Sequence, residues 1–199
     1  MQPKKDAAEA PRRSDAQRNR ERILEVALAE LTRDADAPLS QIAKKAGVGQ
    51  GTFYRNFPSR EALVLEVYRH EMQQVADSAD ALLREQDPQR ALRTWMDRLA
   101  RFAMTKAGLA DALRQATSAP GGPAKPAPTA VTEAAERLLR VNEKAGTIRP
   151  GVGAEDFMLA IAGLWHVGAA EDAPARAGRL LDLVMDGLRA GAPGRGVLE

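Results

Sequence analysis

Apolar residues recur along most of the chain at intervals of three and four positions, with polar and charged residues between them. That interval places the apolar side chains on one face of an α-helix, whereas a half-buried strand would need strict alternation. Runs of β-branched residues are missing, while Ala, Leu, Arg and Glu, which favour helices, are abundant. The pattern predicts an all-α protein.

The pattern and its punctuation predict about nine helices. Pro38 suits the first turn of a helix, Gly47 supplies a helix stop, and Ser59 can cap the helix after it. The stretch SAPGGPAKPAP, residues 118–128, is expected to be a loop because Pro and Gly interrupt helices. The predicted helices cover residues 15–33, 39–46, 50–56, 59–85, 88–106, 109–117, 129–146, 154–169 and 174–190.

Charge and periodicity divide the chain into three expected regions. Residues 1–13 are charged and lack an apolar face, which predicts a disordered basic tail. The first three helices occupy residues 14–60, and a larger helical body occupies residues 61–199. Residues 1–60 contain 12 Lys and Arg against 8 Asp and Glu, whereas the rest contains 17 against 19, so the basic excess lies at the N-terminal end. This asymmetry is typical of a nucleic-acid-facing end, although a merely solvated tail gives the same signal.

Residues 39–57, LSQIAKKAGVGQGTFYRNF, have the spacing of a helix-turn-helix. Ala43 is small enough for two helices to cross closely, and Gly47, four positions later, can take the left-handed conformation that ends a helix. Val48 and Phe53 are the apolar residues expected to hold the corner. An ordinary αα-hairpin is the alternative interpretation. The helix after the turn, however, is rich in groups that can hydrogen-bond to base edges and phosphates, which favours DNA binding.

This segment resembles the TetR/AcrR family of bacterial one-component regulators. The resemblance rests on AGVGQGTFYRNFPSREAL, residues 46–63, and on RERILEVALAEL, residues 20–31. It implies an N-terminal three-helix helix-turn-helix DNA-binding domain and a C-terminal helical ligand-binding and dimerisation domain. It also implies that Ser40 faces the DNA backbone and that Arg60 replaces a phosphate-contacting lysine. The expected DNA-binding residues are Ser40, Gln50, Gly51, Thr52, Tyr54, Arg55, Asn56 and Arg60.

Four features depart from the pattern of this family. Ala37-Pro38 stands where a threonine usually caps the second helix, and RDADAP replaces the usual glycine after the first helix. Gly49 replaces a common serine, and Asn56 replaces a common histidine or tyrosine. These departures leave the expected fold in place and concern particular base and phosphate contacts.

The resemblance also implies a ligand cavity among the middle helices of the body. Aromatic and methionine side chains can line a permissive pocket, although such side chains more often form plain core. Few buried charges are expected there, which favours an apolar or aromatic effector. The expected ligand-binding residues are Met72, Trp95, Met96, Leu99, Phe102, Met158, Trp165 and His166.

The last two predicted helices are amphipathic and contain small residues that permit close packing. In the family, this pair of helices forms the four-helix bundle of a homodimer. Intramolecular core is the alternative role, and both can hold because the two faces of one helix can serve different partners. The expected dimer-interface residues are Phe157, Ile161, Leu164, Leu180, Leu181, Val184 and Leu188.

Several classes of protein are disfavoured by composition. The chain has no Cys, no Ser-His-Asp ordering and no Gly-rich phosphate loop after a strand, so we expect no enzyme and no cofactor. Glu66 and His70 are spaced like metal ligands, but no third ligand is evident and a surface pair is the more common outcome. No apolar run is long enough for a membrane span, and the N-terminus lacks the apolar stretch of a signal peptide, which predicts a cytoplasmic protein.

The sequence therefore predicts a sequence-specific transcriptional regulator, a homodimer that binds a pseudo-palindromic operator in double-stranded DNA. We expect it to be a repressor that a small-molecule effector releases from the operator. Two alternatives stay open at this point. One is a regulator without a small-molecule effector, either an activator or a protein controlled by a partner protein. The other is a helical lipid-binding or hydrolytic protein.

Overall fold

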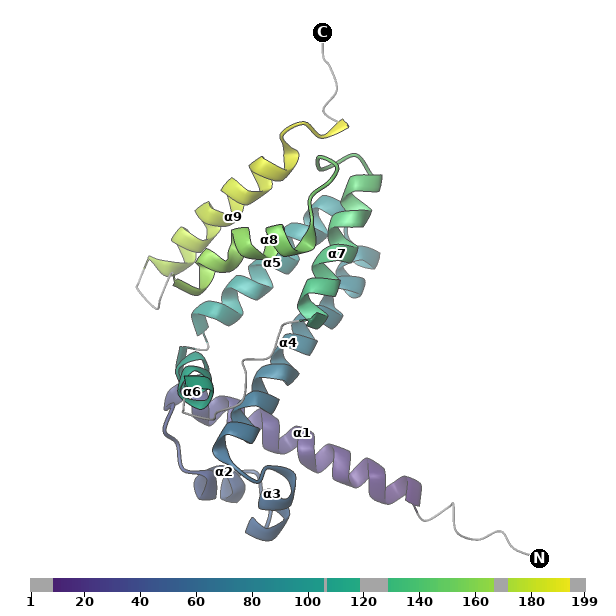
Figure 1. Ribbon diagram of the computed structural model, residues 1–199. Coiled ribbons are helices and arrows are strands. Elements are labelled where there is room, and N and C mark those ends of the chain that lie inside the picture. Colours follow the sequence, from purple (N-terminus) through teal and green to yellow (C-terminus); the bar gives the residue numbers. More distant parts are fainter. Residues whose placement is uncertain (1–8, 106, 119–128, 167–171, 194–199) are drawn as a thin grey trace, which may run out of the picture. The chain divides into compact units, whose positions relative to one another are not determined.

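The computed structural model describes residues 9–105, 107–118, 129–166 and 172–193 (Figure 1). Within these ranges the chain forms nine α-helices, one 3-10 helix and no strand, which confirms the predicted all-α fold. The elements are α1 Glu9–Arg33, α2 Leu39–Lys45, α3 Gln50–Asn56, α4 Arg60–Glu85, α5 Pro88–Thr105, α6 Ala107–Ser118, α7 Thr129–Lys144, α8 Ala154–Ile161, η1 Ala162–His166 and α9 Ala173–Arg189.

The largest differences from the predicted helix ends are at α1 and α8. α1 begins at Glu9, so residues 9–13 are helical where a disordered tail is predicted. Pro11 lies in the first turn of α1, where a residue without an N–H group interrupts no helical hydrogen bond. Residues 1–8 of the predicted tail lie outside the described residues. The helix predicted over residues 154–169 ends as α8 at Ile161 and continues as the tighter 3-10 helix η1.

The chain divides into two compact units. The described residues of unit 1 are 9–70 and 108–118, and those of unit 2 are 71–105, 107, 129–166 and 172–193. Unit 1 therefore extends past the boundary expected at residue 60. Leu63, Val64 and Val67 of α4 are buried, so the first turns of α4 belong to the core of unit 1.

Unit 1 contains the predicted helix-turn-helix. Ile42 and Ala43 of α2 and Phe53 of α3 are almost completely buried, together with the apolar face of α1. Gly47 has a φ of 66°, in the left-handed region that favours glycine, and it ends α2 as predicted. Its N–H donates to the Lys44 carbonyl at 3.1 Å, and the Val48 N–H donates to the Ala43 carbonyl at 3.1 Å.

The start of α6 also belongs to unit 1 and approaches the end of α1 closely. A Cβ added to Gly108 would collide with the carbonyl oxygen of Leu31 and would lie 2.7 Å from that of Thr32. Four apolar residues of α6 are buried: Leu109, Ala112, Leu113 and Ala116. The absence of a side chain at residue 108 is therefore what permits the backbones to meet.

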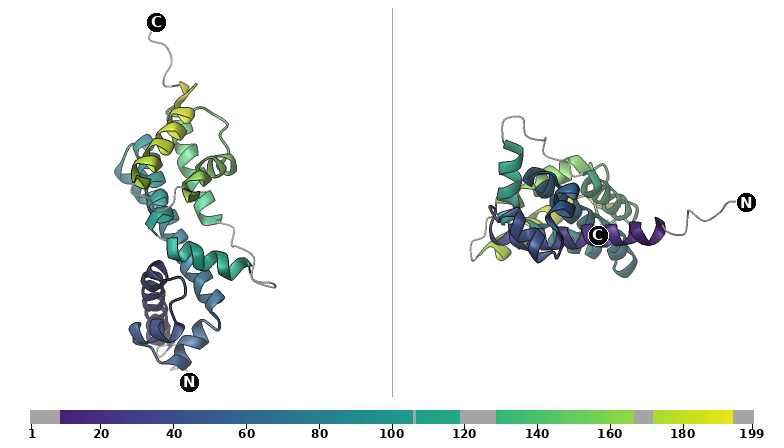
Figure 2. Two further views of the ribbon diagram at one scale, coloured as in Figure 1. Left: turned by 90° about the vertical axis from the view of Figure 1, so that its left-hand side faces the viewer. Right: turned by 90° about the horizontal axis from the view of Figure 1, so that it is seen from below.

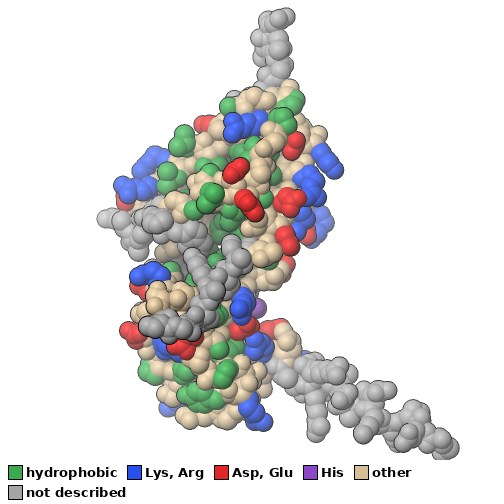
Figure 3. Space-filling view, in the orientation of Figure 1, with side chains coloured by type: hydrophobic (Ala, Val, Ile, Leu, Met, Phe, Trp, Pro, Cys, Tyr) green, Lys and Arg blue, Asp and Glu red, His purple; other side chains and the backbone are tan. Residues whose placement is uncertain are grey.

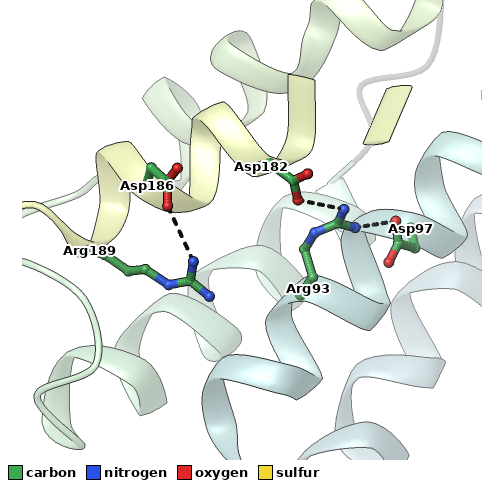
Figure 4. Close-up of polar contacts among 5 residues, drawn as sticks. All are labelled: Arg93, Asp97, Asp182, Asp186 and Arg189. Atoms are coloured by element: carbon green, nitrogen blue, oxygen red, sulfur yellow. Dashed lines mark hydrogen bonds and ion pairs between the residues drawn. The ribbon is translucent and has the colours of Figure 1, made fainter. Parts of the chain in front are cut away.

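Unit 2 is a bundle in which α5 contacts α7, η1 and α9, while α8 contacts α7 and α9 (Figure 2). Trp95 is completely buried, and its indole N–H donates to the Val75 carbonyl at 3.0 Å. Arg93 joins two helices at the surface, because it pairs with Asp97 on α5 and with Asp182 on α9, the latter at 3.0 Å (Figure 4). Among the described residues, no helix is both long enough and apolar enough to cross a membrane.

Candidate nucleic-acid interface

The short helix α3 carries six of the eight predicted DNA-binding residues. Phe53 is completely buried and anchors the helix, whereas Gln50, Tyr54 and Arg55 are exposed, with 44% of Tyr54 accessible. Gly51 is also exposed, and Thr52 and Asn56 are half-buried. The helix is therefore anchored by one buried apolar side chain and exposes a polar and aromatic face.

Two of these side chains bind their own helix. The Arg55 Nε donates to the Gly51 carbonyl at 3.0 Å, and its Nη2 lies 3.3 Å from the Thr52 hydroxyl. The Asn56 amide donates to the Thr52 carbonyl at 2.9 Å. Arg55 must therefore exchange these weak contacts if it is to reach a phosphate or a base.

Phe57 and Arg20 hold the C-terminal end of α3 in place. The Phe57 ring lies 5.9 Å from that of Phe53, and the Arg20 guanidinium lies 4.8 Å from the centre of the Phe57 ring. Arg20 also pairs with Glu66 at 2.5 Å, and Arg69 pairs with Glu66 at 2.6 Å. Partial burial alone would raise the pKa of Glu66, but the hydrogen bonds from Arg69 and Arg20 hold that pKa below its ordinary value.

A buried carboxylate, Glu30 of α1, holds α2. Only 4% of Glu30 is exposed, and it accepts hydrogen bonds from Gln41 at 2.7 Å and from Lys45 at 2.6 Å. Arg33 pairs with its other oxygen at 3.0 Å. The hydrogen bonds from Lys45 and Gln41 lower the pKa of Glu30. Sequence reasoning missed this residue, although an acidic residue one turn after the buried Ala27 was a signal that it could have used.

The other two predicted DNA-binding residues, Ser40 and Arg60, lie at the starts of α2 and α4. Ser40 is exposed. Arg60 is half-buried, and its guanidinium donates to the carbonyl oxygens of Ala37, at 2.9 Å, and Ala35. Ser59 caps α4 as predicted, since its hydroxyl accepts the Ala62 N–H at 3.2 Å.

Most of the predicted ligand-binding residues are core in unit 2. Met72 and four residues of α5 are buried, and Met158 of α8 is half-buried. The side chains of Trp165 and His166 lie outside the described part of the structure. A cleft of about 250 Å³ opens between α5 and α9, and none of the predicted ligand-binding residues lines it. The four buried residues of α5 are Trp95, Met96, Leu99 and Phe102.

The predicted dimer-interface residues divide into a buried and an exposed group. Within the single chain, the structure buries Phe157, Ile161, Leu164, Leu181 and Leu188. Val184 is half-buried and Leu180 is 37% exposed. Leu159 and Leu183, which are not among the predicted interface residues, are 73% and 70% exposed. Figure 3 shows hydrophobic side chains among charged ones over α8 and α9.

The spacing Glu66 to His70 does not form part of a metal cluster in the described residues. No group of three His, Cys, Asp or Glu side chains there could hold a metal ion. Glu66 instead pairs with the two arginines described above.

Comparison with protein families assigns both ends of the chain. Residues 23–67 match the model of the TetR family of bacterial regulatory proteins. Residues 87–190, more than half of the chain, match the model of the C-terminal domain of SbtR-like transcriptional regulators. No curated protein matches the sequence.

Solved structures give the same assignment. A TetR transcriptional regulator from Streptomyces coelicolor is 41% identical, with a TM-score of 0.69 over 85% of this chain and 98% of that one. A TetR regulator from Mycobacterium vanbaalenii is 33% identical, with a TM-score of 0.67 over 89% of this chain and 98% of that one. A fatty acid degradation regulator from Bacillus halodurans is 18% identical and, with a TM-score of 0.58 over 85% of this chain and 99% of that one, shares the fold.

These matches decide between the broad interpretations of the sequence. TetR-family proteins are DNA-binding regulators and not enzymes, so the prediction of a non-enzymatic regulator is confirmed, and a helical lipid-binding or hydrolytic protein is not supported. Regulators of this family act as dimers on operator DNA and respond to small molecules. The chain belongs to the TetR family of transcriptional regulators.

Proposed function

We propose that the chain is a homodimeric repressor that α3 holds on a pseudo-palindromic operator and that a small molecule releases. The observation that carries the proposal is the surface of α3, where Gln50, Tyr54 and Arg55 are exposed around the buried anchor Phe53. Exposed polar side chains on a rigidly anchored short helix suit contact with base edges in the major groove. Because its target is operator DNA, we place the protein in the cytoplasm.

The predicted DNA-binding residues divide between contacts with the DNA backbone and contacts with bases. Ser40 and the basic side chains are suited to phosphates, which position a protein on DNA without reading its sequence. Gln50 and Asn56 have the amide groups that can pair with adenine, and Arg55 has the fork that can pair with guanine. Phosphate contacts by arginine would make the affinity fall steeply as salt is added.

A second copy of the chain is proposed to cover the exposed leucines of α8 and α9. Leu180 and Leu183 lie one turn apart on α9, with Gly187 following one turn later, and Leu159 is exposed on α8. The predicted interface residues that are buried in the single chain would support this surface from beneath. A dimer presents two copies of α3, which predicts half-sites about one helical turn, or roughly 34–36 Å, apart.

The effector is proposed to be apolar or aromatic and to enter unit 2 near α5. Trp95, Met96 and Phe102 supply aromatic and polarizable surface there, and Met72, Leu99 and Met158 add to it. The effector must weaken operator binding by the same factor by which the operator weakens effector binding. The coupling free energy behind this factor is typically about 1–3 kcal/mol.

A selection experiment tests DNA binding. The full chain selects duplexes from a randomised pool, and one selected duplex is used in gel shifts with the double variant Tyr54→Ala/Arg55→Ala. We expect that variant to lose the shift while its circular dichroism is unchanged. Arg98→Ala, which removes an exposed arginine of α5, is the control and should bind like the parent. Equal binding by the double variant and the parent would show that α3 does not read the DNA.

A thermal-shift screen tests release. Apolar and aromatic compounds that stabilise the free protein are added to the complex with the selected duplex, and the displaced DNA is measured. We expect the strongest stabilisers to release it. If such a compound binds the free and the DNA-bound dimer equally well, it cannot shift the equilibrium and the proposed switch is wrong.

A further inference from the structure

The helix α2 begins without a side-chain cap. Pro38 occupies the N-cap position with φ −64° and ψ 134°, and no side chain hydrogen-bonds to the first N–H groups of the helix. Pro38 has no hydroxyl or amide with which to accept such a bond. Within the segment before α2, the Ala37 N–H donates to the Asp34 carbonyl at 3.1 Å, and the Asp36 N–H donates to the Asp34 carboxylate at 2.9 Å.

The side chain of Arg60 ties this segment to the start of α4. One guanidinium nitrogen donates to the Ala37 carbonyl at 2.9 Å and the other to the Ala35 carbonyl. Ala37 is only 2% exposed, and Arg60 supplies a donor to its carbonyl. A planar fork can hold two carbonyls at once in a fixed geometry, which a lysine ammonium on a flexible stem does not impose.

The helix α2 itself is held by Glu30. Its carboxylate accepts from Gln41 and Lys45, one turn apart on α2. Arg60 therefore holds the segment that enters α2, while Glu30 holds the helix itself. Among the described residues, α2 packs mainly on α1 and α3, and a helix of this length has little stability of its own.

We propose that Arg60 is a positioning residue that stabilises the uncapped start of α2 by holding the carbonyls of the segment before it. It orders residues 35–37 before DNA arrives and thereby sets α2, which packs on α3, in the orientation that the DNA requires. Pre-ordering lowers the conformational entropy that is lost on binding. The inference rests on the proposed DNA-binding role of α2 and α3, but the ordering itself is a property of the free protein.

The first arm of the test separates positioning from charge. Arg60→Lys keeps the charge and removes the fork. In the free protein we expect amide exchange at Gln41 and Ile42, whose N–H groups donate to the Pro38 carbonyl, to become about tenfold faster. Amides in the core of unit 2 should exchange as in the parent. Arg84→Lys, an exposed arginine further along α4, is the matched control and should change neither set.

The second arm measures affinity for a duplex selected by the parent from a randomised pool. Arg60→Lys should bind about tenfold more weakly while the slope of affinity against salt stays the same, because the number of phosphate charges is unchanged. The variant Pro38→Thr adds the cap that α2 lacks, in a backbone conformation that suits an N-cap residue. Adding Pro38→Thr to Arg60→Lys should restore both the slow exchange and the affinity.

Failure of this inference and failure of the proposed function give different results. If the parent selects no duplex, the proposed function fails, and the exchange measurement on the free protein still decides the ordering by Arg60. If Arg60→Lys exchanges and binds like the parent, or if Pro38→Thr rescues neither property, Arg60 does not position α2 and the inference is overturned.

Discussion

Different kinds of interaction stabilise the interior of each of the two units. Unit 1 uses charged and polar side chains at its corners: Glu30 binds α2, Arg20 links Phe57 to Glu66, and Arg60 binds the segment before α2. The core of unit 2 consists of apolar side chains such as Trp95. Among the described residues of this unit, Asn142 is the polar residue that is completely buried.

Helix length explains the difference. α2 and α3 have 7 residues each, whereas α5 and α9 have 18 and 17. A short helix buries few apolar side chains, so directional hydrogen bonds must set its orientation, while a long amphipathic helix is aligned by its buried face. We therefore expect the stability of unit 1 to depend mainly on its hydrogen-bonding groups and on pH. The stability of unit 2 should depend mainly on the volume of its apolar side chains.

The largest expected effect is in the core of unit 2. Trp95→Ala removes a completely buried indole and one of the hydrogen bonds to the Val75 carbonyl, which also accepts from the Ser78 hydroxyl. We expect a loss of about 3–5 kcal/mol in the free energy of unfolding, measured by urea denaturation. Arg98→Ala, on the exposed side of the same helix, should cost little. A small loss for Trp95→Ala would contradict the apolar description of this unit.

The next prediction compares two neighbouring leucines of α9. Leu183 is 70% exposed and Leu181 only 1%. Leu183→Glu should leave the helical content unchanged and shift the protein from dimer to monomer in analytical ultracentrifugation. Leu181→Glu should instead unfold unit 2, because it buries a carboxylate without a partner. A Leu183→Glu protein that stays a stable dimer would place the interface elsewhere.

A smaller loss is expected where α6 meets α1. Gly108→Ala puts a methyl group against the carbonyls of Leu31 and Thr32, so one backbone must move. We expect about 1–3 kcal/mol of destabilisation, the usual cost of overpacking, seen as a lower thermal midpoint. Gly178→Ala on α9 serves as the control because an added Cβ meets no atom there. Equal midpoints for the two variants would show that the backbones tolerate the extra group.

The smallest expected effect is the acid sensitivity of unit 1. The hydrogen bonds described above lower the pKa of Glu30 and Glu66 in the folded chain. Their stabilisation is therefore complete above the unfolded pKa, about 4.3, and is lost as the pH falls through the lower folded pKa. In the variant Glu30→Gln, the free energy of unfolding should fall less between neutral and acid pH than it does in the parent. Urea unfolding at a series of pH values measures this fall. Glu25→Gln, an exposed residue of α1, should leave the pH dependence as in the parent.

The sequence by itself determined the helices and the helix-turn-helix corner. Gly47 and Phe53 behave in the structure as their spacing predicts, because a helix stop and a helical face depend on residues only a few positions apart. The polar residues of α3 were also identifiable, since the motif that carries them is continuous. Their contacts with DNA stay predictions.

Only the tertiary structure decided which apolar and charged residues meet across the chain. Leu181 and Leu183 lie on different faces of α9, and it is the packing of α5 on one of these faces that buries the first and leaves the second exposed. Arg60 was predicted to contact phosphate, and the structure places its guanidinium on carbonyls 23 and 25 residues away. Glu30 was not singled out at all. Such pairings depend on how helices cross in space, and helical periodicity carries no information about the residue on the other side.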